Sequence, residues 1–183
     1  RCVVCHGCYD APCQLKLTSI DGIKRGASSE KVYDGSRILS MKPTRLNIDA
    51  KSISEWRKKN FHPVIADTNS TPEENLDNSL IYKFLQLKEM FPQPRAGLIS
   101  KEIDTSLNRE QYCAKVDDFE DFVEDHTNLG MPFALPNLTH KEFLTLGHWI
   151  AQGSNGNDDK VQNLKTRQLI ARFEDLLNKS GLK

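Results

Sequence analysis

Three stretches of the chain place apolar residues three or four positions apart, which is the spacing of one helix face. They predict helices over residues 71–90, 139–153 and 160–179. Shorter apolar patterns predict small helices around Trp56 and Phe119. The segments between them are rich in Pro, Gly, Asn and Ser, which favour turns and loops. The pattern therefore predicts a mainly α fold with long connecting loops.

Local signals mark the ends of two of these helices. Thr71 stands before a proline and two glutamates, an order that suits the start of a helix. Thr139 and Glu142 have the spacing of a capping box, in which each side chain accepts from the other's backbone N–H. Gly153 is expected to end that second helix. Gly147 shares its apolar face, and the close approach of another helix is one reason to place a glycine there.

Composition and charge exclude several classes of function. The chain has 183 residues and no net formal charge, so no basic surface for nucleic acid is expected. No apolar run of about 18 residues is present, which argues against a transmembrane helix. The sequence also carries no phosphate-binding loop for a nucleotide. We expect a domain over residues 1–153, a linker over 154–159 and an amphipathic helix within 160–183 that leads into a following region.

The first residues carry the strongest chemical signal. Cys2-Val3-Val4-Cys5-His6 is the C-x-x-C-H pattern of covalent haem attachment. Each thiol adds to one vinyl group of the porphyrin, and two intervening residues let one turn of chain reach both vinyls. His6 then follows as a ligand to the iron. The sequence therefore predicts haem c, with Cys2, Cys5 and His6 as the residues that bind it.

The remaining cysteines leave alternatives open. Cys2, Cys5, Cys8 and Cys13 read C-x2-C-x2-C-x4-C, close to a ferredoxin-type iron–sulfur run. A structural zinc site or a disulfide-stapled loop would also use clustered cysteines. If haem is bound, Cys8, Cys13 and Cys113 are spare, and two of them can pair in an oxidising compartment. The sequence does not choose that pair.

A second protein ligand is expected on the other face of the iron. Met131 lies in a loop held by glycine and proline just before the capped helix, so its thioether can project from a fixed backbone. A thioether opposite histidine raises the reduction potential of haem. We therefore predict His6 and Met131 as the metal ligands. The other candidates are Met41, Met90, His62, His126, His140 and His148.

These features together resemble known families. The haem motif, Met131-Pro132 and the helix that follows are similar to a cytochrome c fold with long inserted loops and without its N-terminal helix. Segments 2–17, Pro43-Thr44-Arg45-Leu46, Glu55-Trp56-Arg57 and Gly130-Met131-Pro132 more closely resemble the bacterial fatty acid cis/trans isomerases. Because those enzymes are several times longer, and because this chain begins one residue before the motif, we expect a fragment whose activity needs the full-length protein.

The resemblance implies a function. Members of that family are periplasmic haem c proteins that convert cis double bonds of membrane phospholipid acyl chains to trans. It implies that the haem iron acts transiently on the alkene, with His6 as its ligand and with no general acid or base. The helix at 160–179 would allow peripheral contact with a membrane. The alternative is a periplasmic electron-transfer cytochrome, which would use the same residues.

Overall fold

The computed structural model describes residues 1–32, 42–66, 70–94, 99–106 and 110–154. These residues form seven α-helices and two short 3-10 helices, and they contain no β-strand, only an isolated bridge between Ala27 and His62. The prediction of a helical fold is therefore confirmed for this part of the chain. The elements are α1 (Cys2–Cys5), η1 (Pro12–Gln14), α2 (Ile20–Arg25), α3 (Ile53–Lys58), α4 (Pro72–Asp77), α5 (Leu80–Met90), α6 (Phe119–Asp125), η2 (Thr127–Leu129) and α7 (His140–Ala151).

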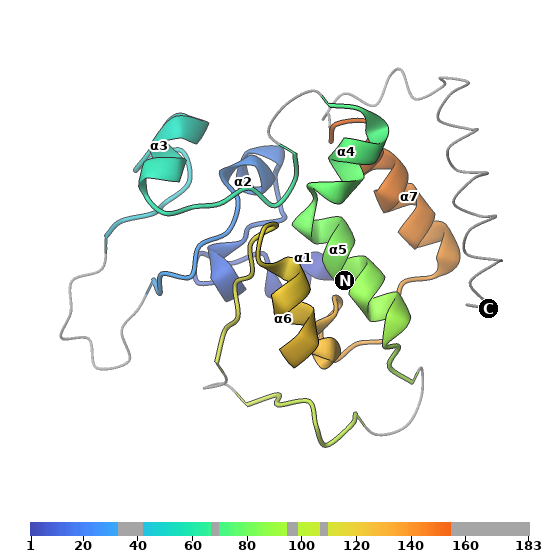
Figure 1. Cartoon of the computed structure of the whole chain (residues 1–183). Helices are drawn as coiled ribbons and strands as arrows, with labels where there is room; N and C mark the ends of the chain where they lie inside the picture. Colours follow the sequence, from blue (N-terminus) through green and yellow to red (C-terminus); the bar gives the residue numbers. More distant parts are fainter. Residues whose placement is uncertain (33–41, 67–69, 95–98, 107–109, 155–183) are drawn as a thin grey trace.

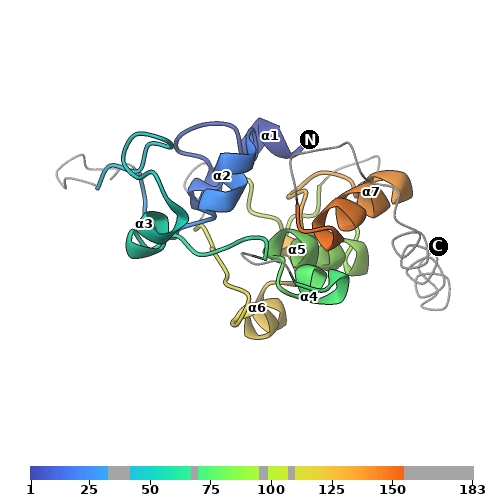
Figure 2. The ribbon, with the colours of Figure 1, turned by 90° about the horizontal axis from the view of Figure 1, so that it is seen from above.

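Helix α5 lies in the middle of the arrangement. Helices α4 and α7 pack beside it, whereas α2 and α3 lie on the other side of the molecule (Figure 1). Seen from above, α5 lies between α1 and α6 (Figure 2). Helix α5 therefore lies between two separate groups of elements.

Two apolar clusters hold these elements together. One joins α4, α5 and α7, and its buried members are Leu76, Tyr82, Leu85, Leu138, Phe143, Ile150 and Ala151. The other joins α5, α6 and the segments at 13–27, with Ala27, Val64, Leu80, Leu87 and Phe119 buried. A fully buried leucine or phenylalanine contributes about 1.5–3 kcal/mol. The second cluster is the one that supports the N-terminal cysteine segment, because Cys13 and Leu15 pack against it.

The predicted helix over residues 71–90 is two helices. Its start is as expected, with Thr71 and Glu74 forming a capping box around Pro72. The chain then leaves the helix at Asn78, and the Ser79 hydroxyl accepts from the N–H of Tyr82 to begin α5. A serine competes for backbone donors in this way and favours a cap over a helix interior.

The capped helix at residue 139 is confirmed. Thr139 and Glu142 form both hydrogen bonds of the capping box, and α7 runs from His140 to Ala151. Another helix does approach Gly147, as expected, and that helix is α5. A Cβ at Gly147 would lie 3.3 Å from the Tyr82 ring.

None of the helices in the described ranges is both long enough and apolar enough to span a bilayer. Ser154, where the linker was expected to begin, is buried, and its N–H donates to the carbonyl of Trp149. The rest of that linker and the predicted helix at 160–179 lie outside the described residues.

Candidate functional site

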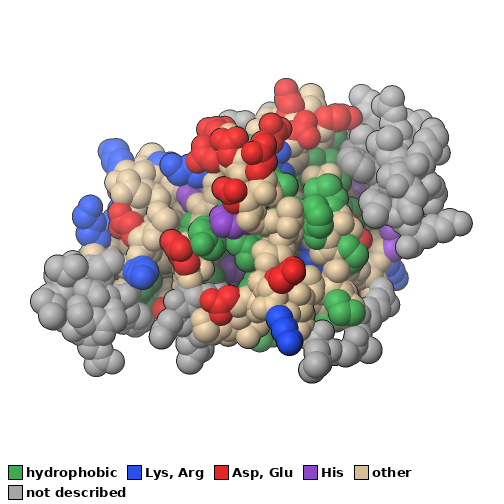
Figure 3. All heavy atoms as spheres, turned by 60° about the horizontal axis from the view of Figure 1, so that its bottom comes forward, with side chains coloured by type: hydrophobic (Ala, Val, Ile, Leu, Met, Phe, Trp, Pro, Cys, Tyr) green, Lys and Arg blue, Asp and Glu red, His purple; other side chains and the backbone are tan. Residues whose placement is uncertain are grey.

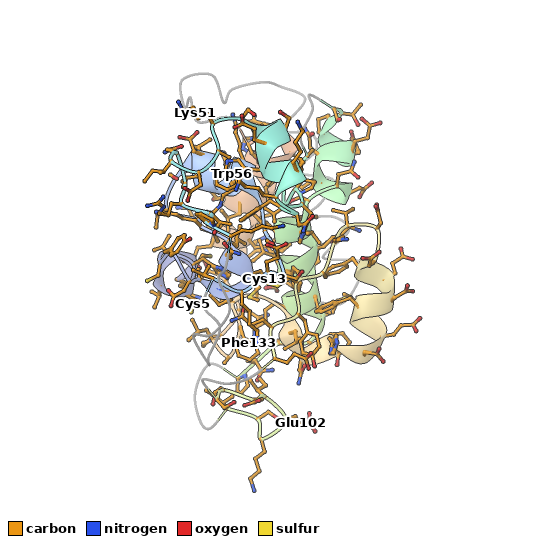
Figure 4. The ribbon with its side chains drawn as sticks, turned by 90° about the vertical axis from the view of Figure 1, so that its left-hand side faces the viewer. Cys5, Cys13, Lys51, Trp56, Glu102 and Phe133 are labelled. Carbon is orange, nitrogen blue, oxygen red and sulfur yellow. A yellow bond between two sulfur atoms is a disulfide. The ribbon has the colours of Figure 1, made fainter. Side chains whose placement is uncertain are left out.

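The two motif cysteines are free and share one turn of helix. Helix α1 consists of Cys2–Cys5 alone, and positions three apart lie on the same face of a helix. Cys2 is half-buried and Cys5 is exposed, and neither is in a disulfide. In Figure 4, Cys5 lies toward the outer edge of the molecule, with Cys13 further in. The turn thus presents two thiols that can each form a thioether.

His6 is fixed by three hydrogen bonds. Its N–H donates to the carbonyl of Cys2 (3.0 Å), and its own carbonyl accepts from the N–H of Leu17 (2.8 Å). Its Nδ1 lies 3.2 Å from the carbonyl oxygen of Leu15. A carbonyl only accepts, so Nδ1 carries the proton of this bond and Nε2 keeps a lone pair. The ring is therefore held in the tautomer that can donate to a metal.

Burial supports the same state of His6. Desolvation lowers the pKa of the imidazole from 6.5, and the hydrogen bond to Leu15 opposes this only in part. Burial disfavours the charged form of a histidine. Metal-binding histidines commonly have the second ring nitrogen on a backbone carbonyl, which orients the ring. His6 has this arrangement.

The fourth cysteine of the N-terminal run is in a disulfide. Cys13 is bonded to Cys113, which is 100 residues further along the chain, while Cys8 is free and exposed. A cysteine in a disulfide supplies no thiolate to a metal. The disulfide therefore removes Cys13 from the four cysteines of the iron–sulfur alternative.

Met131 lies in a loop that is bound to α5. Its N–H donates to the carbonyl of Phe84 (3.0 Å). The preceding Gly130 is buried against the same helix, and a Cβ there would be 2.5 Å from the backbone nitrogen of Lys88. Only glycine allows such an approach. The Met131 backbone is therefore fixed, while its side chain is half-buried.

Hydrogen bonds connect this loop to the cysteine motif. Arg1, next to Cys2, donates from its guanidinium to the carbonyl of Asn137 (2.8 Å). The Asn137 side chain in turn donates to the carbonyl of Lys88 (3.2 Å) and to Glu89 (3.2 Å). The structure thus brings α1, the loop at 130–138 and the end of α5 together.

The other candidate ligands differ in their surroundings. Met90 is 52% exposed, and His140 is exposed at the start of α7. His148 contacts Gln152, and His126 packs against the rings of Tyr112 and Phe122. His62 lines a separate pocket of about 290 Å³ with Ser70, Lys115 and Asp117. Met41 lies outside the described residues.

Asn137 and Lys88 were not predicted from the sequence. Asn137 connects three segments, and Lys88 is almost completely buried with 2% of its surface exposed. Lys88 falls on the apolar side of α5, since it is seven positions after Ile81 and four after Phe84. The sequence already contains this signal, because a lysine within an apolar stripe is a candidate for a buried charge.

Comparison with known proteins gives one family. The family model for fatty acid cis/trans isomerase (CTI) matches residues 41–183. This range includes Met131 and α7 and excludes the cysteine motif. Searches of the curated proteins and of the solved structures each gave no match.

Proposed function

This chain belongs to the fatty acid cis/trans isomerase family, and we propose that it is the haem c domain of such an enzyme, with a cytochrome c-like arrangement of its iron ligands. Family membership implies isomerisation of cis to trans double bonds in fatty acyl chains. The finer proposal assigns covalent attachment to Cys2 and Cys5. It assigns iron binding to His6 and Met131, which would be the two protein ligands of the metal.

The residues present fit this group. Two free thiols lie one helical turn apart, and the histidine after them has an Nε2 lone pair with Nδ1 on a carbonyl. The observation that carries the proposal is this fixed tautomer of His6, because it is the one state of the ring that binds iron through Nε2. The hydrogen bond from Arg1 to Asn137 holds the methionine loop next to the same motif.

The chemistry divides between the cofactor and the protein. When bound, haem would supply reversible one-electron chemistry, and temporary loss of π-bond character is what rotation about the double bond requires. Cys2 and Cys5 would hold that group in place, and His6 would donate to the iron. The Met131 thioether would set the reduction potential or would yield its position to substrate. No proton moves in a cis to trans isomerisation, so no side chain is assigned as acid or base.

An apolar surface next to the motif supports an acyl chain as substrate. Val3 and Val4, between the two cysteines, are 49% and 79% exposed. Leu135, in the methionine loop, is 40% exposed. Hydrophobic side chains also reach the surface in patches between charged ones on the face shown in Figure 3. Exposed apolar patches of this kind commonly mark membrane or ligand contact, so we propose that phospholipid acyl chains in a membrane reach the haem from such a surface.

The Cys13–Cys113 disulfide supports the proposed periplasmic location. Disulfides persist in oxidising compartments such as the bacterial periplasm and are rare in the cytosol. Covalent haem attachment through thiols also takes place in the periplasm of bacteria.

Haem loading tests the proposal. The protein is produced with a cytochrome c maturation system, and the pyridine haemochrome spectrum is recorded after the pigment has been extracted with acid and solvent. We expect that wild-type protein keeps its haem after extraction and shows a c-type band. The double variant Cys2→Ser/Cys5→Ser should show no such band. Cys8→Ser is the matched control, because Cys8 is also free and exposed but lies outside the motif. Wild-type protein without covalent haem would contradict the proposal.

A further inference from the structure

Lys88 is a buried cation whose ammonium makes no hydrogen bond within the described residues. It is 2% exposed, and its Nζ has no hydrogen-bond partner there. Burial lowers the pKa of Lys88 from 10.5, and the charge of the neighbouring Glu89 carboxylate opposes this only in part, without forming a salt bridge to it. A buried ammonium that makes no hydrogen bond lowers the stability of a fold. The Lys88 ammonium therefore keeps free donors for an acidic group from outside the described side chains.

Other buried polar atoms without partners differ from Lys88. The Arg25 Nε is unpaired, but the guanidinium donates to the carbonyls of Thr44 and Gln14 and lies over two aromatic rings. The remaining two atoms, His62 Nε2 and Asn75 Oδ1, belong to groups that are neutral or have a lowered pKa. Among these four atoms, only Lys88 Nζ belongs to an ammonium group, and it makes no hydrogen bond.

The position of Lys88 relates it to the haem site. A long side chain on a helix covers the turn N-terminal to its own Cα, which for Lys88 is the turn of Phe84. The carbonyl of Phe84 binds the Met131 backbone, and Gly130 lies against the Lys88 backbone. Asn137 joins the Lys88 carbonyl to Arg1, the neighbour of Cys2. The methionine loop therefore contacts this part of α5 directly, whereas Arg1, next to the cysteine motif, is joined to it through Asn137.

We propose that the Lys88 ammonium binds a propionate carboxylate of the haem and positions the ring between the motif and the methionine loop. This inference rests on the proposed haem. A haem carries two propionates, and a carboxylate is the usual partner of a buried ammonium. The ion pair neutralises charge close to the iron, so Lys88 acts on the reduction potential without touching the iron.

The test compares Lys88→Met, which removes the charge at similar volume, with Lys88→Arg, which retains it. Lys141→Met is the control, because it removes an exposed lysine at the start of α7. The measurements are the haem midpoint potential and its dependence on pH, recorded on haem-loaded protein. We expect Lys88→Met to raise the ferric to ferrous ratio at fixed potential about tenfold, which is 59 mV for one electron. We also expect the propionate pKa to rise, because the neighbouring cation is lost.

A second measurement uses protein without haem. There Lys88→Met is expected to stabilise the fold, since it replaces a buried unpaired charge with an apolar side chain. In haem-loaded protein the same change is expected to destabilise it. This reversal of sign distinguishes an ion pair with haem from a simple packing role.

The outcomes separate the two proposals. Wild-type protein that binds no haem overturns the haem proposal and this inference together. Haem-loaded Lys88→Met with unchanged potential and propionate pKa overturns the inference alone, and so does a change equal to that of Lys141→Met. If Lys88→Met loads too little haem to measure, Lys88→Gln and Lys88→Arg are compared. Loading rescued by arginine alone supports the ion pair, and equal loading in both contradicts it.

Discussion

The Cys13–Cys113 disulfide is expected to stabilise the domain more than any other bond between its side chains. It joins the segment after the cysteine motif to the segment before α6, and the two residues are 100 positions apart. Cys13 also receives a hydrogen bond from the N–H of Ser28 and donates its own N–H to Gln111. Breaking the disulfide increases the conformational freedom of the unfolded chain. The hydrogen bonds of Cys13 can still form in the folded protein.

The size of the effect follows from the loop. In the chain-entropy model, closing a loop of about 100 residues removes unfolded-state entropy worth about 4.7 kcal/mol at 25 °C. We therefore expect Cys13→Ala to lower the free energy of unfolding by about 4–5 kcal/mol. Cys113→Ala should have nearly the same effect, because either change breaks the same bond. The double variant should be little worse than either single one, which is the strong non-additivity of a shared interaction.

Urea unfolding followed by circular dichroism measures these differences, with all proteins in one state of haem loading. Cys8→Ala is the matched control, since Cys8 is a free and exposed cysteine of the same segment, and its loss is expected to be within about 0.5 kcal/mol. Reduction of the wild-type protein should reproduce the Cys13→Ala value. A loss below about 1 kcal/mol, or additive losses in the two single variants, would show that the loop argument is wrong.

Three further predictions concern the Arg45–Asp49 pair, the start of α7 and the methionine loop. The hydrogen bond from Arg45 lowers the pKa of Asp49 from 3.8 to about 2. Their pairing therefore stabilises the fold above about pH 4 and is lost as the pH falls toward 2, and Arg45→Gln should return the pKa of Asp49, measured by NMR titration, toward 3.8. Thr139→Ala removes the N-cap of α7 and should lower the free energy of unfolding by about 1 kcal/mol. Gly130→Ala would place a methyl group against the backbone of Lys88, so it should cost about 1–3 kcal/mol and alter the absorption spectrum of haem-loaded protein.

Each of these has a result that counts against it. An Asp49 pKa that is unchanged in Arg45→Gln would mean that another group depresses it. Thr139→Ser keeps the hydroxyl and should retain most of the stability, so equal losses for serine and alanine would contradict the capping explanation. A Gly130→Ala protein with wild-type stability and spectrum would show that the methionine loop accommodates a methyl group at position 130.

Local chemistry explains which elements could be predicted. The capping boxes at Thr71 and Thr139 each involve residues three apart, so the sequence alone specifies their hydrogen bonds. The placement of Cys2 and Cys5 on one turn also depends on a short separation and was predicted. The hydrogen bond that sets the tautomer of His6 was not predicted, because Leu15 is nine residues away. The break at Ser79 was missed because apolar periodicity continues across it.

Features that depend on distant contacts were out of reach. Cys13 could have paired with Cys8 or Cys113, and only the packing of the segment before α6 against the second apolar cluster brings Cys113 to it. The role of Asn137 is similar, because its two partners, Arg1 and Lys88 of α5, are 136 and 49 residues away in the sequence. The hydrophobic pattern predicts which face of a helix is buried, but it does not specify which other segment covers that face.

We propose that His6 supports the isomerisation through haem iron. The direct test is the conversion of cis to trans fatty acids in membrane phospholipids, measured by gas chromatography, with full-length enzyme that carries His6→Ala. His140→Ala is the control, since His140 is an exposed histidine at the start of α7. We expect that His6→Ala loses the conversion while His140→Ala retains it. Undiminished trans fatty acid formation in His6→Ala would contradict it.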